Sequence, residues 1–433
     1  MQNSKMITAT LVLLTAVATT AFDILPKELG NFYLGQAAFL EVFQSEQATE
    51  NYADQFTLYI SNFNPLSLAQ KDYIYYIKSP GSQLNDVNNW VPTKIDQENY
   101  WPNDLYFMSS SIVGREGIIW TSGFLVPTKT KGCLNIYFTD QEPFDGPYNI
   151  ASLDDQDYSY HRIIWRDVNG DGLSDAVTAR FHTGLLGSVT KQFLWLENPG
   201  NSQLEGWTQH MINEDGADIH FQIEQLPVGG TAYDVQLNGE FWNEKVTIYY
   251  GTDNANFWQN PSVLQEVVVD DTIGQPFDLY YWDINLDGVK EIIVTAYNGS
   301  YGNVFAYTVP EDFRTGTFER HTLAEGFEAN FILGGQSMTP GAAHLFYISD
   351  EHEQSGEKPY ILLSGDDDGK HYILTAASQD KNDWSYEKNV YLDTKATTTG
   401  KSVVADLDGD GKKEIVAAAY SAGRVYVYTY GDV

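Results

Sequence analysis

Asp167-Val-Asn-Gly-Asp-Gly-Leu-Ser-Asp175, Asp283-Ile-Asn-Leu-Asp-Gly-Val-Lys-Glu291 and Asp406-Leu-Asp-Gly-Asp-Gly-Lys-Lys-Glu414 are three acidic loops of one pattern. Each has an oxygen-bearing side chain at positions 1, 3 and 5, a Gly at position 6 and a carboxylate at position 9. Alternate residues of a tight loop can turn their side chains toward one centre, and the Gly lets the backbone fold back. Such a shell suits a hard cation that takes about six to eight oxygen ligands.

The loops predict about three bound Ca²⁺ ions with a structural role. Oxygen-only ligands favour Ca²⁺ over Zn²⁺, and Mg²⁺ usually keeps more of its waters than a loop so rich in ligands would leave it. Position 7 offers its backbone carbonyl. The candidate metal ligands are Asp167, Asn169, Asp171, Leu173 and Asp175; Asp283, Asn285, Asp287, Val289 and Glu291; and Asp406, Asp408, Asp410, Lys412 and Glu414.

The sequence around the loops favours strands over the helices of an EF-hand. At position 12, where an EF-hand has a bidentate Glu, stand Thr178, Val294 and Ala417. Short apolar, β-branched and aromatic runs flank each loop, as in Ile-Ile-Val-Thr-Ala-Tyr after Glu291. An Asp- and Gly-rich hairpin turn without a metal is the alternative interpretation.

The spacing of the loops predicts a repeat. Asp167 and Asp283 are 116 residues apart, and Asp283 and Asp406 are 123 apart, so each interval holds two units of about 60 residues. Strand-like runs without the acidic pattern stand near the half-way points and before the first loop. They begin at Phe39, Leu105, Tyr233 and Leu345. The segment 233–240 is predicted to be the first strand of its unit. Together with the three loops, this predicts seven units.

Each unit ends in a strand that starts with an aromatic residue, as in the runs that begin at Trp90, Trp207, Phe318 and Trp384. The last unit lacks this strand, because only Gly-Asp-Val follows Tyr430. The run that begins at Phe22 can supply it from the other end of the chain. The sequence therefore predicts an all-β, seven-bladed β-propeller of four-stranded blades whose ring is closed by an N-terminal strand.

The acidic loop between two strands, repeated in this rhythm, resembles the FG-GAP/VCBS repeat family. The resemblance is specific over about residues 160–180, 280–300 and 400–430, and the Phe-Gly and Gly-Ala-Pro signature of integrin α-chains is absent. It implies a Ca²⁺-binding β-propeller with metal loops between the first two strands of a blade, usually structural. It implies no catalytic residue.

The N-terminal sequence and the composition predict where the protein is found and which partners it excludes. Residues 1–21 read as a signal peptide, which leaves residues 22–433 as a single secreted, extracellular propeller domain without membrane insertion. The net charge of −34 argues against nucleic acid as a partner. Cys133 is the only cysteine and reads as a small core residue. Asn298 heads the only N-glycosylation sequon. The oligomeric state is left open.

These features favour a non-enzymatic binding or adhesion module for an extracellular carbohydrate or protein. Trp101, Trp120, Trp165, Trp242 and Trp282 are candidates for stacking on sugars, or else they pack between blades. A Ca²⁺-dependent polysaccharide lyase or related sugar-active enzyme is the second interpretation, but no catalytic motif stands out and the eight His are scattered. An acidic matrix or biomineral protein is the third. Its one candidate tract, Gly365-Asp-Asp-Asp-Gly369, reads as a solvated turn.

Overall fold

The computed structural model describes residues 22–47, 49–64, 72–97, 99–124, 129–151, 157–183, 188–331 and 337–432. The predicted signal peptide, residues 1–21, lies outside them. Within the described residues, helix is confined to short segments such as α1 (Ser110–Val113), α2 (Asp350–Ser355) and the 3₁₀ segment η2 (Pro80–Asn89). No helix in this part of the chain is long and apolar enough to span a membrane.

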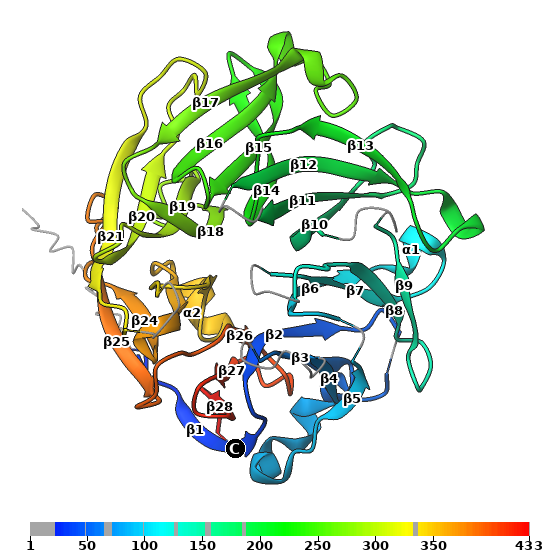
Figure 1. Ribbon diagram of the computed structural model, residues 1–433. Coiled ribbons are helices and arrows are strands. Elements are labelled where there is room, and N and C mark those ends of the chain that lie inside the picture. The colour runs from blue at the N-terminus through cyan, green and yellow to red at the C-terminus, as the bar shows by residue number, and fades with distance from the viewer. Residues whose placement is uncertain are drawn as a thin grey trace, which may run out of the picture.

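Seven four-stranded antiparallel sheets stand around one axis, which confirms the predicted propeller (Figure 1). We number these blades in chain order. In blades 1 to 6 the strands follow one another outward from the axis: β2 (Ala37–Gln44), β3 (Phe56–Asn62), β4 (Tyr73–Lys78) and β5 (Thr93–Asp96); β6 (Pro102–Met108), β7 (Gly117–Ser122), β8 (Leu134–Phe138) and β9 (Asp145–Asn149); β10 (Ser159–Arg166), β11 (Asp175–Thr183), β12 (Val189–Glu197) and β13 (Thr208–Asn213); β14 (His220–Val228), β15 (Thr231–Glu240), β16 (Lys245–Gly251) and β17 (Leu264–Asp270); β18 (Gln275–Trp282), β19 (Glu291–Tyr297), β20 (Gly302–Thr308) and β21 (Glu319–Phe327); β22 (Ala343–Phe346), β23 (Tyr360–Ser364), β24 (Lys370–Ala376) and β25 (Tyr386–Asp393).

Blade 7 is built from both ends of the chain. Its strands are β26 (Ser402–Ala405), β27 (Glu414–Ala419), β28 (Arg424–Thr429) and, outermost, β1 (Lys27–Tyr33). β1 runs antiparallel to β28 from the pair Lys27 and Thr429 to the pair Tyr33 and Arg424. Figure 1 shows β1 beside β28, close to the C-terminus. The predicted closure by an N-terminal strand is confirmed.

One strand assignment in blade 4 is wrong. The segment 233–240, taken as the first strand of its unit, belongs to the second strand, β15. The inner strand is β14, and Gly229 and Gly230 connect the two strands with φ angles of +56° and +85°. A two-residue turn of this kind needs positive φ at both positions, which Gly supplies without strain. Blade 4 therefore has a tight hairpin where blades 3, 5 and 7 have acidic loops.

The core lies between neighbouring blades. Blades 3 and 4 meet through the buried side chains of Trp195, Phe221 and Trp258. Blades 7 and 1 meet through Leu40, Leu58 and their neighbours, packed against Val416 and Val427. Each such layer removes large apolar surfaces from water. The ring can therefore be stable without a disulfide, since its one cysteine is unpaired.

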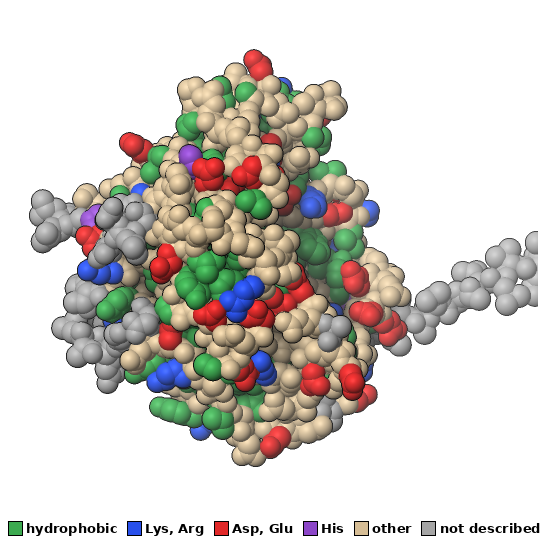
Figure 2. All heavy atoms as spheres, turned by 90° about the vertical axis from the view of Figure 1, so that its right-hand side faces the viewer, with side chains coloured by type: hydrophobic (Ala, Val, Ile, Leu, Met, Phe, Trp, Pro, Cys, Tyr) green, Lys and Arg blue, Asp and Glu red, His purple; other side chains and the backbone are tan. Residues whose placement is uncertain are grey.

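The up-and-down order of the strands gives the propeller two distinct ends. The connections from the first to the second strand of each blade, and therefore all three acidic loops, lie at one end, which we call the acidic-loop face. The hairpins between second and third strands lie at the opposite end. Figure 2 shows the rim of the molecule, where acidic side chains are spread in small groups and no single acidic tract stands out.

Candidate functional site

The three acidic loops share one hydrogen-bonding pattern. The Gly at position 6 donates its N–H to the Asp at position 1, over 3.0, 2.9 and 3.1 Å in the three loops. The residue at position 7 donates its N–H to the Asp at position 5, over 2.8 Å in each loop. Position 2 donates to the carboxylate at position 9 over 2.9, 3.1 and 2.8 Å. The common pattern holds the predicted ligand side chains inside each loop.

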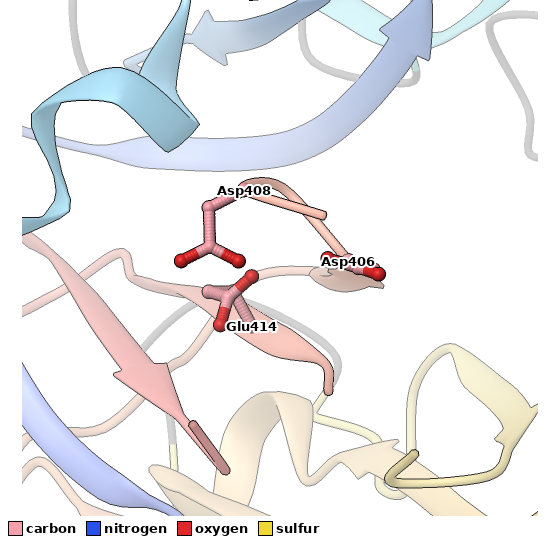
Figure 3. A group of neighbouring side chains, drawn as sticks. All are labelled: Asp406, Asp408 and Glu414. Carbon is pink, nitrogen blue, oxygen red and sulfur yellow. The ribbon is translucent and has the colours of Figure 1, made fainter. Parts of the chain in front are cut away.

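The third loop brings three carboxylates together. Oxygens of Asp406, Asp408 and Glu414 lie within 4.8 Å of one another. Figure 3 shows the carboxylates of Asp408 and Glu414 turned toward each other, with Asp406 beside them on the same loop. The first two loops have Asn169 and Asn285 at the position of Asp408, so an amide oxygen stands there instead. All three donor sets are hard oxygens, which fit Ca²⁺.

The position-9 carboxylates are buried. Asp175, Glu291 and Glu414 are 0%, 1% and 1% exposed. Burial, with the nearby Asp287 and Asp283, raises the pKa of Glu291 to about 8. Burial likewise raises the pKa of Glu414 to about 7. A bound cation would favour the ionised form of these groups and offset the cost of burying them.

Each acidic loop also contacts the next blade along the ring. Gln259, from blade 4, donates its side-chain amide to the carbonyl of Asn169 over 3.1 Å. Lys381, from blade 6, donates its ammonium group to the carbonyl of Leu286. In blade 7, the carbonyl of Leu407 lies against Gly81 of blade 1. The loops thus stand at joints between blades.

Blade 2 carries a related carboxylate that the sequence interpretation missed. Glu116 directly precedes the second strand, β7, and is 7% exposed. Its carboxylate accepts from Ser45 Oγ over 2.8 Å and from the backbone N–H of Glu46 over 2.5 Å, both in blade 1. The sequence signal for this carboxylate is a Glu directly before an apolar strand of a predicted unit. Here protein donors from the neighbouring blade stand in place of an acidic loop.

The five candidate tryptophans behave differently from one another. Trp120 is fully buried. Trp101 has both faces of its ring covered, by Phe63 at 4.0 Å and Phe124 at 4.8 Å between centroids. Trp165 and Trp242 are half-buried. Trp282 is 42% exposed and directly precedes the second acidic loop. Packing therefore accounts for Trp120 and Trp101, and Trp282 is the most accessible of the five.

The sequence missed a ring of polar side chains around the axis, which we call the axial ring. Its members come from the seven inner strands or the residue before them: Glu41, Asp104, Arg162, His220, Asp278, His344 and Lys401. Lys401 contacts Glu41, 360 residues away, and Asp104, 297 residues away, the latter over 2.8 Å. Arg162 and Asp278 both approach His220 Nε2, at 2.7 and 2.8 Å.

The axial ring is closely coupled electrostatically. Burial raises the pKa of Glu41 to about 7, against the opposing influence of Lys401. Burial would also raise the pKa of Asp278, but the adjacent His220 lowers it on balance. Burial lowers the pKa of His344 to about 4. No sequence motif announces these residues, because each lies on a different blade and they meet only in the closed ring.

The turn at Gly365–Gly369 is not solvated, so that prediction is wrong. Asp367 and Asp368 are only 7% and 6% exposed. Asp367 accepts from Thr398 Oγ1 over 2.8 Å, and Asp368 accepts from Tyr372 Oη over 2.5 Å. The loop after β25 covers the turn, a contact that the local sequence does not reveal.

Two other predicted residues are placed as follows. Cys133 is half-buried, its sulfur is 2.9 Å from Ser122 Oγ, and burial raises the pKa of its thiol to about 12. A thiol this hard to ionise is a poor nucleophile.

Asn298 is exposed in the turn between β19 and β20, and its side chain accepts hydrogen bonds from the N–H groups of Ser300 and Tyr301.

Comparison with known proteins places the repeat in the last blade. Residues 401–428 match the FG-GAP repeat family. A search of the curated proteins found no match. Similar solved structures include the Dos1 propeller (TM-score 0.44, 10% identity, 91% of this chain and 78% of that chain). Puromycin hydrolase has a TM-score of 0.48 and 10% identity over 92% of this chain and 53% of that chain. The soluble aldose sugar dehydrogenase of Escherichia coli has a TM-score of 0.40 and 9% identity over 76% of this chain and 95% of that chain.

Likenesses this distant carry no functional argument. The matched segment, in contrast, contains β26, the third acidic loop, β27 and all but the last residue of β28. The chain is thus an all-β, seven-bladed propeller with an FG-GAP repeat in its last blade.

Proposed function

We propose that this protein is a secreted, calcium-binding β-propeller that acts as a non-enzymatic binding module for an extracellular carbohydrate or protein. The observation that carries the metal part of the proposal is the hydrogen-bonding pattern shared by the three acidic loops. The third loop also brings oxygens of Asp406, Asp408 and Glu414 within 4.8 Å of one another. The extracellular placement rests on the sequence of residues 1–21.

In this proposal each ion would be held by the side chains at positions 1, 3, 5 and 9 and by the carbonyl at position 7. Bound Ca²⁺ supplies positive charge that offsets the mutual repulsion of the loop carboxylates. The chain's own residues then transmit this ordering to the next blade. Gln259 and Lys381 do so by holding loop carbonyls, and Gly81 does so by close packing.

Titration with Ca²⁺ tests the proposal. Isothermal titration calorimetry on the EDTA-treated protein should show binding, and Ca²⁺ should raise the melting temperature by mass action. Saturation to about 100 times Kd adds about 2.7 kcal/mol per site. Replacing Asp171, Asp287 and Asp410 together by Ala should remove most of this rise. The same variant measured in EDTA gives the cost of the lost loop hydrogen bonds, which is subtracted. No heat of binding and no effect of EDTA would rule the metal out.

A further inference from the structure

The acidic-loop face has a hollow of ≈ 690 Å³ beside the inner strand of blade 4. Its lining comes from the end of β10 (Arg166), from β14 (Glu224), from β15 (Asp234) and from blade 5 (Tyr281, Val289 and Lys290). Volumes of about 300–1,000 Å³ are usual for sites that bind small molecules. The hollow lies where three blades meet, so its walls are fixed by the packing of the ring.

One polar atom in the lining has no partner. Asp234 Oδ2 accepts from Arg166 over 2.7 Å and from Trp258 Nε1 over 2.5 Å. Asp234 Oδ1 is buried and, among the described residues, has no hydrogen-bond partner. A buried acceptor without a donor costs free energy. A ligand in the hollow would reach the buried Oδ1 only after a movement of the Asp234 side chain, so the polar contact that the hollow offers directly is the Arg166–Asp234 pair.

The composition of the hollow indicates what kind of ligand it takes. Two cations, Arg166 and Lys290, face two carboxylates, Glu224 and Asp234, so the formal charges cancel. The half-buried Tyr281 adds an aromatic ring to the lining, and Lys290 Nζ lies 5.2 Å from the centre of that ring. Mixed donors and acceptors beside an aromatic ring match a neutral, polyhydroxylated molecule.

We infer that this hollow binds a neutral oligosaccharide, and that the second acidic loop forms its metal-dependent wall. Gly288, Val289 and Lys290 line the hollow, whereas no residue of the other two acidic loops does. Val289 occupies position 7, so its carbonyl faces the proposed ion while its side chain, 50% exposed, is free to meet a ligand. The inference rests on the proposed Ca²⁺ binding and assigns the second loop a role that the other two lack.

A glycan array of neutral oligosaccharides, read with Ca²⁺ and with EDTA, identifies the oligosaccharide that binds best, which serves as the probe. Calorimetry then measures the Kd of this probe for the wild-type protein and for matched variants. Val289→Trp fills the hollow, and Val268→Trp is its control, because Val268 is 47% exposed and does not line the hollow. Asp287→Ala removes a ligand from the second loop, and Asp215→Ala is its control, because the Asp215 side chain is 76% exposed and lies outside the acidic loops. Val289→Trp should weaken binding about tenfold or more by occupying the hollow, and Asp287→Ala should do so by loosening its wall. Val268→Trp and Asp215→Ala should leave the Kd within about twofold of wild type.

The outcomes separate this inference from the proposed function. If Ca²⁺ itself does not bind, the proposed function fails. If Ca²⁺ binds but the array is silent, or Val289→Trp binds the probe like wild type, the inference is overturned and the metal proposal stands. Hexalysine serves as the cationic comparison. Binding of hexalysine in place of oligosaccharides, lost in Val289→Trp, would also overturn the assignment, in favour of a basic peptide.

Discussion

Lys401, in blade 7, forms ion pairs with Glu41 of blade 1 and Asp104 of blade 2. Its side chain is 8% exposed, and those of its partners Glu41 and Asp104 are 19% and 16% exposed. Burial alone would lower the pKa of Lys401, but Asp104 and Glu41 together raise it. Removing Lys401 leaves the buried Asp104 and Glu41 without their cation, which costs more than the intact group contributes.

Lys401→Met should therefore lower the free energy of unfolding by about 3–5 kcal/mol at neutral pH. Guanidinium denaturation measures the change. Lys395→Met is the matched control, because the Lys395 side chain is 81% exposed and, in the part of the chain that the structure describes, forms an ion pair with Asp393 alone. A surface pair contributes about 0–1 kcal/mol. Equal effects of the two substitutions would contradict the assigned role of Lys401.

His161 is a buried histidine held by aromatic side chains. It is 8% exposed, and the ring centres of Phe39, Phe124 and Phe181 lie 6.2, 6.4 and 6.2 Å from the centre of its imidazole ring. Burial lowers the pKa of His161 to about 4, against the influence of Asp104 and together with that of His220. Below pH 6.5 the unfolded chain binds a proton here that the folded chain does not, so stability is lost as the pH falls from 6.5 to 4.

His161→Phe should reduce the loss of stability between pH 7 and pH 4. The shift from the ordinary pKa of 6.5 corresponds to about 3 kcal/mol over this interval. Phe keeps the aromatic packing and removes the titrating group. Denaturation curves at the two pH values measure the difference for each protein, so any constant packing cost cancels. An unchanged pH dependence in the variant would show that His161 ionises freely in the folded protein.

At the level of elements, the joint between blade 1 and the third acidic loop depends on one close approach. Gly81, in η2, faces the backbone carbonyl of Leu407, and a Cβ built on Gly81 would lie 1.9 Å from that oxygen. Neither the 3₁₀ segment nor the loop can yield without moving backbone. Gly81 is thus required for packing across the seam next to the closing blade.

Gly81→Ala should lower the free energy of unfolding by about 1–3 kcal/mol, the usual cost of overpacking. Gly35→Ala is the control, because its Cβ would meet only the end of the Tyr33 side chain, at 3.3 Å. The control should change stability by about 0.5 kcal/mol or less. Thermal melts in EDTA and in Ca²⁺ measure both variants. A Gly81→Ala protein as stable as Gly35→Ala would show that the joint is loose.

At the level of the whole molecule, the ring is closed by strand pairing and side-chain packing without a disulfide. Six of the seven residues of β1 pair with β28, from Lys27 to Tyr33, and no disulfide joins the two strands. Closure gives every blade two neighbours and leaves no unpaired sheet face at a seam. Opening this pair exposes the layer between blades 7 and 1 to water, so the closing strand should limit the stability of the ring.

A disulfide between β1 and β28 should stabilise the protein. Tyr33 and Arg424 are directly paired, and both are exposed, so Tyr33→Cys with Arg424→Cys offers a crosslink that closes almost the whole chain. The expected gain is about 2–5 kcal/mol in the oxidised form. Melting temperatures with and without reductant measure it, and the reduced variant is the control. If oxidation leaves the melting temperature unchanged, unfolding does not begin at this seam.

The sequence by itself determined the repeat, the strand–loop–strand units, the three candidate metal loops and the closing strand. These features are local, because a loop pattern and alternating apolar residues are written in consecutive positions and survive in any tertiary context. The assignment failed in blade 4, where the acidic loop that marks the register is replaced by Gly229 and Gly230.

Only the tertiary structure decided what lies on the axis, what is buried at Asp367 and Asp368, and where a hollow forms. Lys401 and Glu41 are 360 residues apart, and the lining of the hollow comes from three blades. Such groups meet only when the ring closes and the blades pack at fixed angles. Burial and pairing then set their chemistry, and neither quantity can be read from neighbouring residues in the chain.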